Sequence, residues 1–371
     1  LYHLIFIVKI KNNMKVCILG NSLTALTLAK AIVNQNIYVD ILTETKVLNL
    51  NKSRTISISK SNLDFFNSNI INVEKLIWKL KKIDIFTDNL KNEKLINFEK
   101  KNDQLFSIIK NFELYKVLEK NLSKNKFFKK KISSSNFSLL NNYEIIINCD
   151  YFHPVTKKYF SKKIVKEYNS FAYTTIIHHE KILNDTATQI FTKKGPLAFL
   201  PISNNETSVV FSLHNSTKNN KENIEELINF YNFKYKINKF EKIDKFKLIS
   251  VYLRSYYHQN ILAFGDLLHR IHPLAGQGFN MTIRDIKMLS KLIKNRYDLG
   301  LPLDISVNEQ FENNLRYKNF VFSNGIDFVH EFFNLERKSK SNILSKSVKF
   351  MGKNPTINKI FTKIADEGSL F

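Results

Sequence analysis

The stretch that decides the fold runs from Ala263 to Asn280 and reads AFGDLLHRIHPLAGQGFN. The apolar run 261–264 predicts a buried strand that ends at Gly265 and Asp266. A proline-to-glycine loop follows, and apolar residues at helical spacing after it predict a long helix. A helix N-terminus stabilises negative charge, so the start of this helix is suited to an anionic or electron-rich ligand. Three of the nine glycines fall in this stretch, which indicates close approach of a ligand to the backbone.

A second pattern, near the start of the chain, predicts a βαβ unit. A short strand over 16–19 reaches Gly20, a helix-periodic segment follows, and a second strand ends at Glu44. A dinucleotide-binding turn needs one glycine for the turn, another for phosphate approach and a small third residue for packing. The chain keeps Gly20, has Ser22 in the second place and satisfies the third with Ala25. The pattern therefore fits an altered phosphate turn or an ordinary strand-turn-helix, and Glu44 fits a ribose ligand or a surface acid.

In the rest of the chain, the spacing of apolar residues separates predicted strands from predicted helices. The apolar run 143–149 predicts a strand buried on both faces, as in a parallel sheet. The β-rich stretch 172–253 predicts an antiparallel sheet with one helix over 222–233. Residues 112–122 have helical spacing, whereas 63–107 has no clear pattern. The sequence thus predicts two bodies followed by helices.

Composition excludes several classes of function. The net charge of +24 comes mostly from Lys, with only seven Arg among 57 basic residues, spread along the whole chain. This pattern predicts a solvated surface and argues against nucleic-acid binding. Both Cys17 and Cys149 lie in apolar strand-like runs, which predicts buried thiols and a reducing, cytoplasmic compartment. The apolar opening is too short for a membrane span, so we treat 1–13 as an extension outside the fold.

The motifs together resemble the ubiquinone-biosynthesis FAD-dependent aromatic hydroxylases, which are para-hydroxybenzoate hydroxylase-like flavin monooxygenases. The resemblance is most specific at Gly265-Asp266, at 272–280 and at Arg284-Asp285. Two weaker matches lie at 54–59 and at 195–201. The resemblance covers about 14–371 and is least specific between 60 and 140.

The resemblance implies an α/β fold, in which a Rossmann-like FAD-binding domain carries an inserted mixed β-sheet substrate domain and C-terminal helices. The FAD-binding domain is expected to be discontinuous, over 14–66, 100–167 and 255–300. The substrate domain is expected to combine 67–99 with 168–254, and the C-terminal helices to occupy 301–371.

The resemblance also implies a set of cofactor-binding residues. Asp266 would hold the ribityl chain, Glu44 the ribose, and Arg54 the phosphate-flavin region. Pro273 would border the reactive face of the flavin, and His272 either lines the flavin pocket or is a structural histidine. No side-chain nucleophile is required. The full set is Gly20, Ser22, Ala25, Glu44, Arg54, Asp150, Gly265, Asp266, Gly276, Gln277, Gly278, Phe279 and Asn280.

The implied reaction is reduction of FAD by NADH or NADPH, capture of O2 as a flavin C4a-hydroperoxide, and hydroxylation of a polyprenylated phenol. The cofactor carries this chemistry and the protein positions it. Two other functions stay open: a flavin-binding accessory protein of the quinone pathway without turnover, and another flavin reaction such as reduction of an isoprenoid. The basic tail 338–363 either lies on anionic lipid or packs on the protein itself, so peripheral association with the inner membrane or with a quinone-biosynthesis complex is possible.

Departures from the family pattern concern the nicotinamide cofactor. The second family fingerprint keeps Asp150 but has Tyr151, Pro154 and Lys157 in its other three positions, and its early Asn-Arg pair is replaced by Asn111-Phe112. Asp150 is therefore either a cofactor contact or a plain strand-end acid. The adjacent His178 and His179 would point to opposite faces of a strand, which favours a structural role over a metal site.

Overall fold

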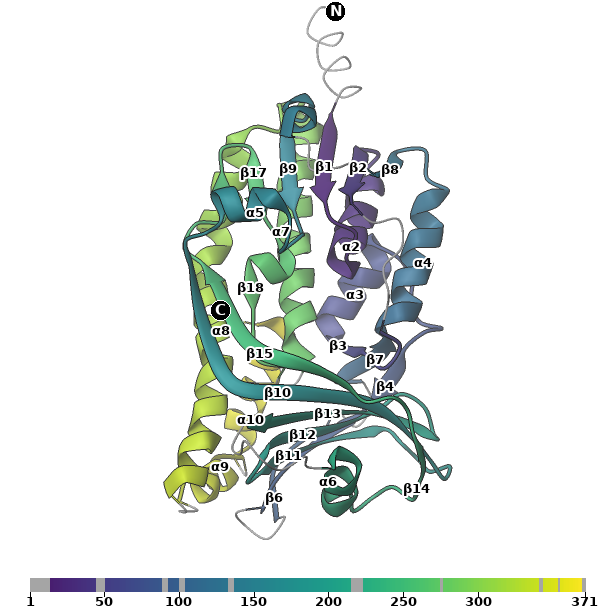
Figure 1. The fold of residues 1–371 in the computed structure, drawn as a ribbon, viewed down its shortest axis with the longest axis vertical. Coiled ribbons are helices and arrows are strands. Elements are labelled where there is room, and N and C mark those ends of the chain that lie inside the picture. Colours follow the sequence, from purple (N-terminus) through teal and green to yellow (C-terminus); the bar gives the residue numbers. More distant parts are fainter. Residues whose placement is uncertain are drawn as a thin grey trace, which may run out of the picture.

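The computed structural model describes residues 14–44, 51–88, 93–99, 104–132, 137–214, 223–273, 276–339, 343–352 and 354–368. The expected extension 1–13, and Leu274 and Ala275 of the proline-to-glycine loop, lie outside the described residues. One body holds a parallel sheet flanked by helices, and the other holds a large, mostly antiparallel sheet (Figure 1). This arrangement confirms the predicted α/β fold class.

The first body is built on a six-stranded sheet with the order β16-β17-β9-β1-β2-β8. All neighbours pair in parallel except β16 with β17. The predicted strand over 143–149 is β9, which lies between β1 and β17, so its buried run does return to the parallel sheet. The strands are β1 (Lys15–Leu19), β2 (Tyr38–Thr43), β8 (Phe128–Ile132), β9 (Ile145–Asn148), β16 (Tyr257–His258) and β17 (Ile261–Ala263).

Helices α2 (Leu23–Val33), α4 (Asn111–Ser123) and α7 (Gln277–Leu299) contribute buried faces to the main core that also contains this sheet. Helix α2 is buried along almost its whole length, because α4 and α7 both pack against it. Helix α7 ends at Gly300, whose φ of +67° suits a glycine C-cap. Cys17 and Cys149 are buried and unpaired, as predicted.

The second body is a nine-stranded mixed sheet with the order β18-β15-β10-β13-β12-β11-β5-β6, and β14 pairs with β10. All its pairs are antiparallel except β11 with β5. The long strands β10 and β15 curve from one body into the other (Figure 1). The bounds are β5 (Lys82–Thr87), β6 (Glu93–Glu99), β10 (Lys163–His179), β11 (Thr186–Thr192), β12 (Gly195–Pro201), β13 (Glu206–His214), β14 (Ile237–Phe240), β15 (Asp244–Leu253) and β18 (His269–Arg270), with α6 (Ile224–Tyr231).

The segment without a clear sequence pattern, 63–107, passes from the first body into the second and back. It includes the end of α3 (Lys60–Asn69), the strands β4 (Trp78–Leu80), β5 and β6, and the start of β7 (Phe106–Lys110). Strand β7 pairs with both β4 and β3 (Thr55–Ser59) in a small third sheet. The segment therefore contributes to two sheets, and the domain boundaries given above remain predictions.

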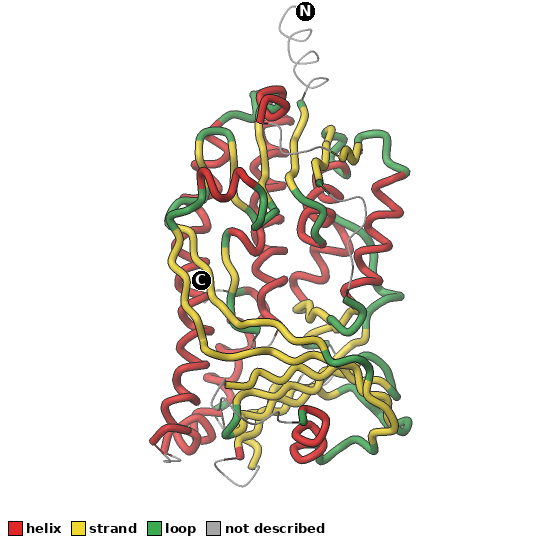
Figure 2. The backbone as a smooth tube through the Cα atoms, viewed as in Figure 1, coloured by secondary structure: helices red, strands yellow, loops and turns green. Residues whose placement is uncertain are grey.

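The C-terminal part is helical. Helix α8 (Ile305–Ser339) runs along the side of both bodies (Figure 2). The last two helices, α9 (Ile343–Gly352) and α10 (Pro355–Glu367), contact β6 and α3 respectively. The remaining elements are α5 (Pro154–Tyr159) and the 3-10 turns η2 (Phe137–Asn142) and η3 (Gly265–Leu267).

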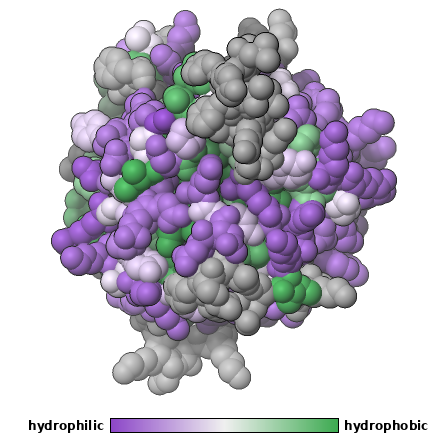
Figure 3. Space-filling model, turned by 90° about the horizontal axis from the view of Figure 1, so that it is seen from above, coloured by the Kyte–Doolittle hydropathy of each residue, from purple (hydrophilic) through white to green (hydrophobic). Residues whose placement is uncertain are grey.

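Seen from above, the described surface is mostly hydrophilic with scattered apolar residues (Figure 3). Within the described ranges, no helix has the length and apolar character that crossing a membrane would require.

Candidate flavin and substrate site

Three neighbouring parallel strands end at the same edge of the first sheet. Strand β1 leads to Gly20, β9 to Asp150 and β17 to Gly265 and Asp266. Gly20 has a φ of +97°, and a Cβ added there would lie 3.0 Å from the Cβ of Asp150. Strand β2, on the other side of β1, leads to the exposed Glu44. The fold therefore brings these predicted cofactor residues to one edge, where ligands of open α/β sheets bind.

Ser22 forms the N-cap of α2. Its Oγ accepts a hydrogen bond of 3.2 Å from the backbone N–H of Ala25, which is fully buried. A serine in this place satisfies one of the unpaired N–H groups at the start of the helix. A glycine would leave that N–H group free to bind a phosphate. Gly265 has a φ of +66°, and an added Cβ would lie 2.7 Å from Cγ2 of Thr24. The end of β17 thus lies directly against the first turn of α2.

The loop before α7 packs against β3 through a glycine. Gly276 has a φ of +61°, and an added Cβ would lie only 2.1 Å from the Oγ of Ser57. The Ser57 hydroxyl donates to the Gly276 carbonyl at 3.2 Å. Gly278, in contrast, has no atom within 4 Å of an added Cβ. The first turn of α7 is therefore held on one side by Ser57 and is open at Gly278.

Asn280 holds this turn in place. Its side chain is fully buried, and its Nδ2 donates to the Ser57 carbonyl at 3.0 Å. Its Oδ1 accepts from the backbone N–H of Ser59 at 2.9 Å and from Nδ2 of Asn62 at 3.0 Å. In the described structure the amide thus ties α7 to β3 and α3, and positions the loop.

Gln277 and Phe279 flank the open glycine. The Nε2 of Gln277 donates to the carbonyl of Ala365 in α10 at 3.2 Å, while its Oε1 is buried without a hydrogen-bond partner. The ring of Phe279 is half-buried, with its centroid 6.5 Å from that of Phe66. An unpaired buried carbonyl oxygen is costly, so Oε1 of Gln277 is suited to a ligand's donor.

A cavity of about 230 Å³ extends from this loop into the space between the two bodies. It is bounded by β4, β5, β6, β7, β11 and β12 and by residues of α8 and α10. None of the described lining residues is charged. They are Ser57, Leu80, Ile83, Ile85, Phe98, Leu105, Phe106, Ile108, Ala187, Thr188, Gln189, Phe191, Ala198, Leu200, Gln277, Ile326, Val329, Thr362 and Ala365.

Two charged residues predicted at the cofactor are solvent-exposed. Asp266 lies in η3 at the end of β17, next to the sheet edge. Arg54 lies just before β3, and its guanidinium stands 5.6 Å from the ring centroid of Phe246. The Arg54 carbonyl accepts from the N–H of Asn111 at 3.0 Å, which joins it to the start of α4. These two contacts place Arg54 beside β15 and the start of α4.

His272 and Pro273 come directly before the loop. Pro273 is half-buried, whereas His272 is 1% exposed and neither of its ring nitrogens has a hydrogen-bond partner. Burial, followed by the nearby His330, lowers the pKa of His272 well below its ordinary value. The ring is therefore neutral at neutral pH.

The loop after β9 is closed on itself. The Asp150 carboxylate accepts from the N–H of Phe152 at 2.9 Å, and its carbonyl accepts from the Thr156 hydroxyl at 2.7 Å. The Tyr151 hydroxyl accepts from Lys163 Nζ at 2.7 Å. Pro154 occupies the first turn of α5, where proline is favoured, and His153 caps that helix. Lys157 is exposed on α5.

A buried pair that sequence reasoning did not single out lies beneath the loop. His269 Nε2 contacts the carboxylate of Asp285, which also accepts from Asn319 at 3.1 Å. The Arg284-Asp285 motif carried the only signal for it. The pair fixes the strand β18 against α7.

The two adjacent histidines of β10 have separate partners. His178 faces Glu206 and Glu241, and the buried His179 bonds to Thr207 and to the Glu180 carbonyl. Across the described part of the chain, no group of three or more His, Cys, Asp or Glu is placed to hold a metal ion.

These residues fit FAD. The turns at Gly20 and Gly276 use backbone angles that favour glycine, and Gly278 leaves open space at the helix N-terminus. Asp266 is available at the strand end for a sugar hydroxyl, and Oε1 of Gln277 lacks a donor. Ser22 departs from the pattern because its side chain occupies part of the α2 terminus.

Comparison with known proteins agrees with this fit. Residues 151–298 match the family described as an FAD binding domain. The chain is 26% identical over 156 residues to the 3-demethoxyubiquinol 3-hydroxylase of Escherichia coli (strain K12), covering 40% of each chain. It is 25% identical over 126 residues to the ubiquinone biosynthesis monooxygenase COQ6 of Schizosaccharomyces pombe, covering 33% of this chain and 26% of that one. The alignments thus span less than half of these curated relatives.

Among solved structures, p-nitrophenol 4-monooxygenase PnpA from Pseudomonas putida DLL-E4 has a TM-score of 0.76 at 10% identity, covering 94% of this chain and 97% of that one. The monooxygenase-like PqsL of Pseudomonas aeruginosa has a TM-score of 0.69 at 12% identity, with coverage of 91% and 99%. These likenesses show that the chain has the fold of FAD-binding monooxygenases. The FAD-binding match covers part of the chain, and the two curated relatives named above are a 3-demethoxyubiquinol 3-hydroxylase and a ubiquinone biosynthesis monooxygenase.

Proposed function

We propose that this protein is an FAD-dependent monooxygenase that hydroxylates the ring of a polyprenylated phenol, with NADH or NADPH as reductant and O2 as oxidant. The observation that carries the proposal is the apolar cavity that ends at Ser57 and Gln277, beside the open turn at Gly278. A flavin at that turn would form one wall of the cavity. The names of the curated relatives support a phenol of ubiquinone biosynthesis as the substrate.

The chain's own residues would bind and orient the cofactor and the substrate, and they would exclude water from the site. When bound, FAD supplies the reduction of O2 and the transfer of one oxygen atom. The N-terminus of α7 stabilises negative charge at the ring edge, and Ser57 and Asn280 hold that terminus in position. The apolar walls would keep water away from the ring of the bound substrate.

The charge of the cavity narrows the substrate class. Because no described lining residue is ionisable, a buried carboxylate on the substrate would be left without a partner, at a cost of several kcal/mol. A neutral phenol with an alkyl or prenyl chain pays no such penalty, and its chain gains about 0.8 kcal/mol per buried CH₂. We therefore assign the cavity to a neutral, apolar phenol.

Contact with a membrane surface would deliver such a substrate. The terminal helices carry Phe350, which is 80% exposed, and the partly exposed Ile360 and Phe361, among several lysines. These helices also pack on β6 and α3. One side of them is therefore held against the protein, while the exposed apolar residues and lysines remain accessible. We propose peripheral binding to anionic lipid through this face.

The test is reconstitution of the purified protein with FAD, followed by addition of NADH or NADPH, O2 and a short-chain 2-prenylphenol. The expected result is a product heavier by one oxygen atom, with ¹⁸O label from ¹⁸O2, and a much weaker reaction with the matching prenylated benzoate. Bound FAD with no phenol-stimulated oxidation of NAD(P)H would favour an accessory protein. Turnover that persists without O2 would favour reduction of an isoprenoid instead.

A further inference from the structure

Three histidines from distant parts of the chain form a row that leads toward the flavin loop. His214 ends β13, His330 lies in α8 and His272 precedes the loop. The ring centroids of His214 and His330 are 5.9 Å apart, and those of His330 and His272 are 4.4 Å apart. Exposure falls along the row, from a half-buried His214 to 5% for His330 and 1% for His272. The row therefore leads from the surface inward.

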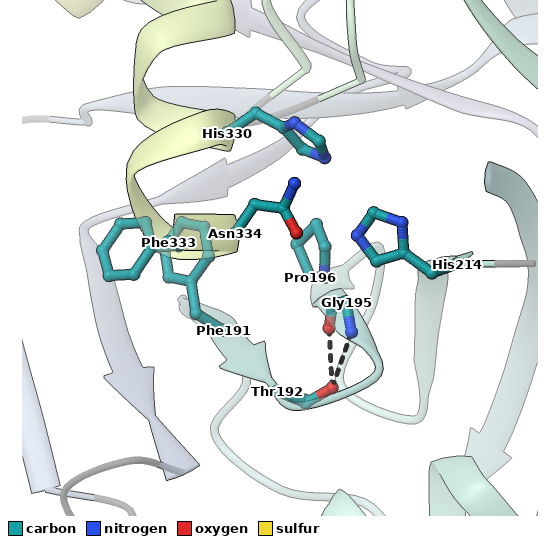
Figure 4. Close-up of a pocket in the computed structure, with 8 residues that line it drawn as sticks. All are labelled: Phe191, Thr192, Gly195, Pro196, His214, His330, Phe333 and Asn334. Atoms are coloured by element: carbon teal, nitrogen blue, oxygen red, sulfur yellow. Dashed lines mark hydrogen bonds between the residues drawn. The ribbon is translucent and has the colours of Figure 1, made fainter. Parts of the chain in front are cut away.

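The outer end opens into a small cavity of about 20 Å³, which His214 and His330 line together with Thr192, Asn334 and others. Figure 4 shows the two imidazoles approaching this pocket from different elements, with the Asn334 amide close to His330. A cavity of this size has room for about one water molecule. His214 Nδ1 is also 2.9 Å from the Ser170 hydroxyl, so the entrance is polar.

The inner end lies one residue from Pro273. His272 packs edge-on against Tyr168, at 5.0 Å between centroids, and both its ring nitrogens lack a partner. Leaving a buried polar atom unpaired costs about 1–3 kcal/mol, and packing alone would be served as well by Phe or Leu. The unpaired imidazole thus indicates a group that exchanges hydrogen bonds rather than one that only fills space.

The proposed reaction needs a proton at this place. Hydroxylation follows ArH + O2 + NAD(P)H + H⁺ → ArOH + NAD(P)⁺ + H2O, so each turnover takes up one proton from the medium. The described lining of the substrate cavity holds no ionisable group that could deliver it. A proton path made of ionisable side chains would therefore run outside the described lining of this cavity.

We propose that His214, His330 and His272 form a proton path from the small surface cavity to the flavin face. This inference rests on the proposed function for its purpose, but the path itself does not depend on turnover. The neutral His272 takes a proton from the outer histidines, by way of ring reorientation and water in the small cavity. It then delivers the proton beside Pro273.

Charged groups on the neighbouring elements set the conditions for this path. Tyr168 and Tyr252 both donate to Asp327 of α8. Lys166 of β10 lies 3.6 Å from Asp327 and 3.2 Å from Glu331. These carboxylates are thus engaged by other donors, and the burial of His272, with the nearby His330, His214 and Lys166, keeps its ring neutral. A neutral imidazole can accept a proton and pass it on.

The test measures exchange of the imidazole N–H protons with solvent water, residue by residue, by ¹⁵N-resolved NMR of the FAD-reconstituted protein. Each exchange moves a proton to or from a ring nitrogen, so the rate at the buried His272 reports the proton path without any turnover. His330→Phe should slow exchange at His272 at least tenfold and leave the exposed His258 unchanged. His258→Phe is the matched control and should not alter His272. His214→Gln, at the rim, should give a smaller slowing if His330→Phe does not fold.

Unchanged exchange at His272 in folded His330→Phe and His214→Gln would overturn the proposal, as would an absence of exchange in the wild type. Hydroxylation by His330→Phe should fall at least tenfold and recover with added imidazole, while FAD affinity stays constant. If the wild type shows no hydroxylation but His272 exchange still depends on His330, the proposed function fails and the path stands.

Discussion

The loops that follow β17 and β9 leave the same sheet edge on adjacent strands, yet they differ in character. After β17, Asp266 is exposed, and the loop ends in an open turn at Gly278. After β9, the Asp150 carboxylate is used by its own loop, and Tyr151 is held by Lys163. The loop after β17 has backbone and side-chain groups available for a ligand. The loop after β9 uses its polar groups in hydrogen bonds within the protein.

This difference separates FAD binding, which the β17 loop is suited to, from nicotinamide binding, which the β9 loop opposes. The β17 loop resembles the family where it would meet FAD, and the β9 loop departs where the family meets both FAD and the nicotinamide. A ligand that approached the β9 loop would have to break contacts of about 1 kcal/mol each. We therefore infer a site in which FAD binding is retained and nicotinamide access is impaired.

The largest effect is expected from Gly278→Val. An added Cβ at Gly278 has no protein atom within 4 Å, so the fold should persist while the flavin ring is blocked. We expect FAD affinity to fall by about 3 kcal/mol or more, as measured by flavin fluorescence titration. Wild-type protein that showed no flavin absorbance with excess FAD would contradict the site itself.

Gly325→Val is the matched control. Gly325 lies in α8, and its added Cβ likewise has no atom within 4 Å. Because both changes replace an open helical glycine by valine, only the position differs. Equal losses of FAD at both positions would mean that the ring loop is not the binding site.

A smaller effect is expected from Asp266→Ala. The carboxylate is exposed at the strand end, so its removal should leave stability nearly unchanged and cost about 1–3 kcal/mol of FAD affinity through a lost charge-assisted hydrogen bond. Asp298→Ala, which removes an exposed acid at the far end of α7, serves as the control. His179→Ala would be a poor control, since His179 is buried between Thr207 and a carbonyl. An Asp266→Ala protein with wild-type affinity would remove this residue from the site.

Local sequence patterns predicted much of the region around β17, but they predicted little of segment 63–107, which joins the two bodies. The run 143–149 was predictable because a strand buried on both faces is continuously apolar, and Gly265-Asp266 because glycine and a strand-end acid are local signals. Segment 63–107 was not, since its short strands serve two sheets and alternate with Asn and Lys. The histidine row was also out of reach, because His214, His272 and His330 meet only through tertiary packing.

The pH dependence of folding gives a third prediction. Because the pKa of His272 is held well below its ordinary value of 6.5, the folded protein binds fewer protons than the unfolded chain once the pH falls below 6.5. Stability should therefore decrease as pH falls, by up to about 1.4 kcal/mol per pH unit from this residue. Urea unfolding at pH 7.5 and 5.5 should show a smaller decrease for His272→Phe than for the wild type. Parallel decreases would show that His272 is protonated in the fold.

The smallest effect concerns the β9 loop. Tyr151 places a ring where the family has an open backbone, and Lys163 anchors that ring by a 2.7 Å hydrogen bond and by a contact 4.2 Å from its centroid. Pro154 additionally removes one N–H donor. Both features oppose close approach of an anionic cofactor, so reduction of FAD by NAD(P)H should be slow or strongly dependent on the phenol.

Replacement of the ring by Tyr151→Gly should restore backbone access and release Lys163 for a phosphate. We expect anaerobic stopped-flow reduction by NADH or NADPH to become several-fold faster, a gain of less than about 1.4 kcal/mol in the barrier. Reduction by dithionite, which needs no nicotinamide site, is the control and should not change. Rapid reduction of the wild type by NAD(P)H alone would show that the closed loop is harmless. No reduction of either protein with any phenol would favour the accessory-protein function, because FAD would then be bound without a route for electrons from nicotinamide.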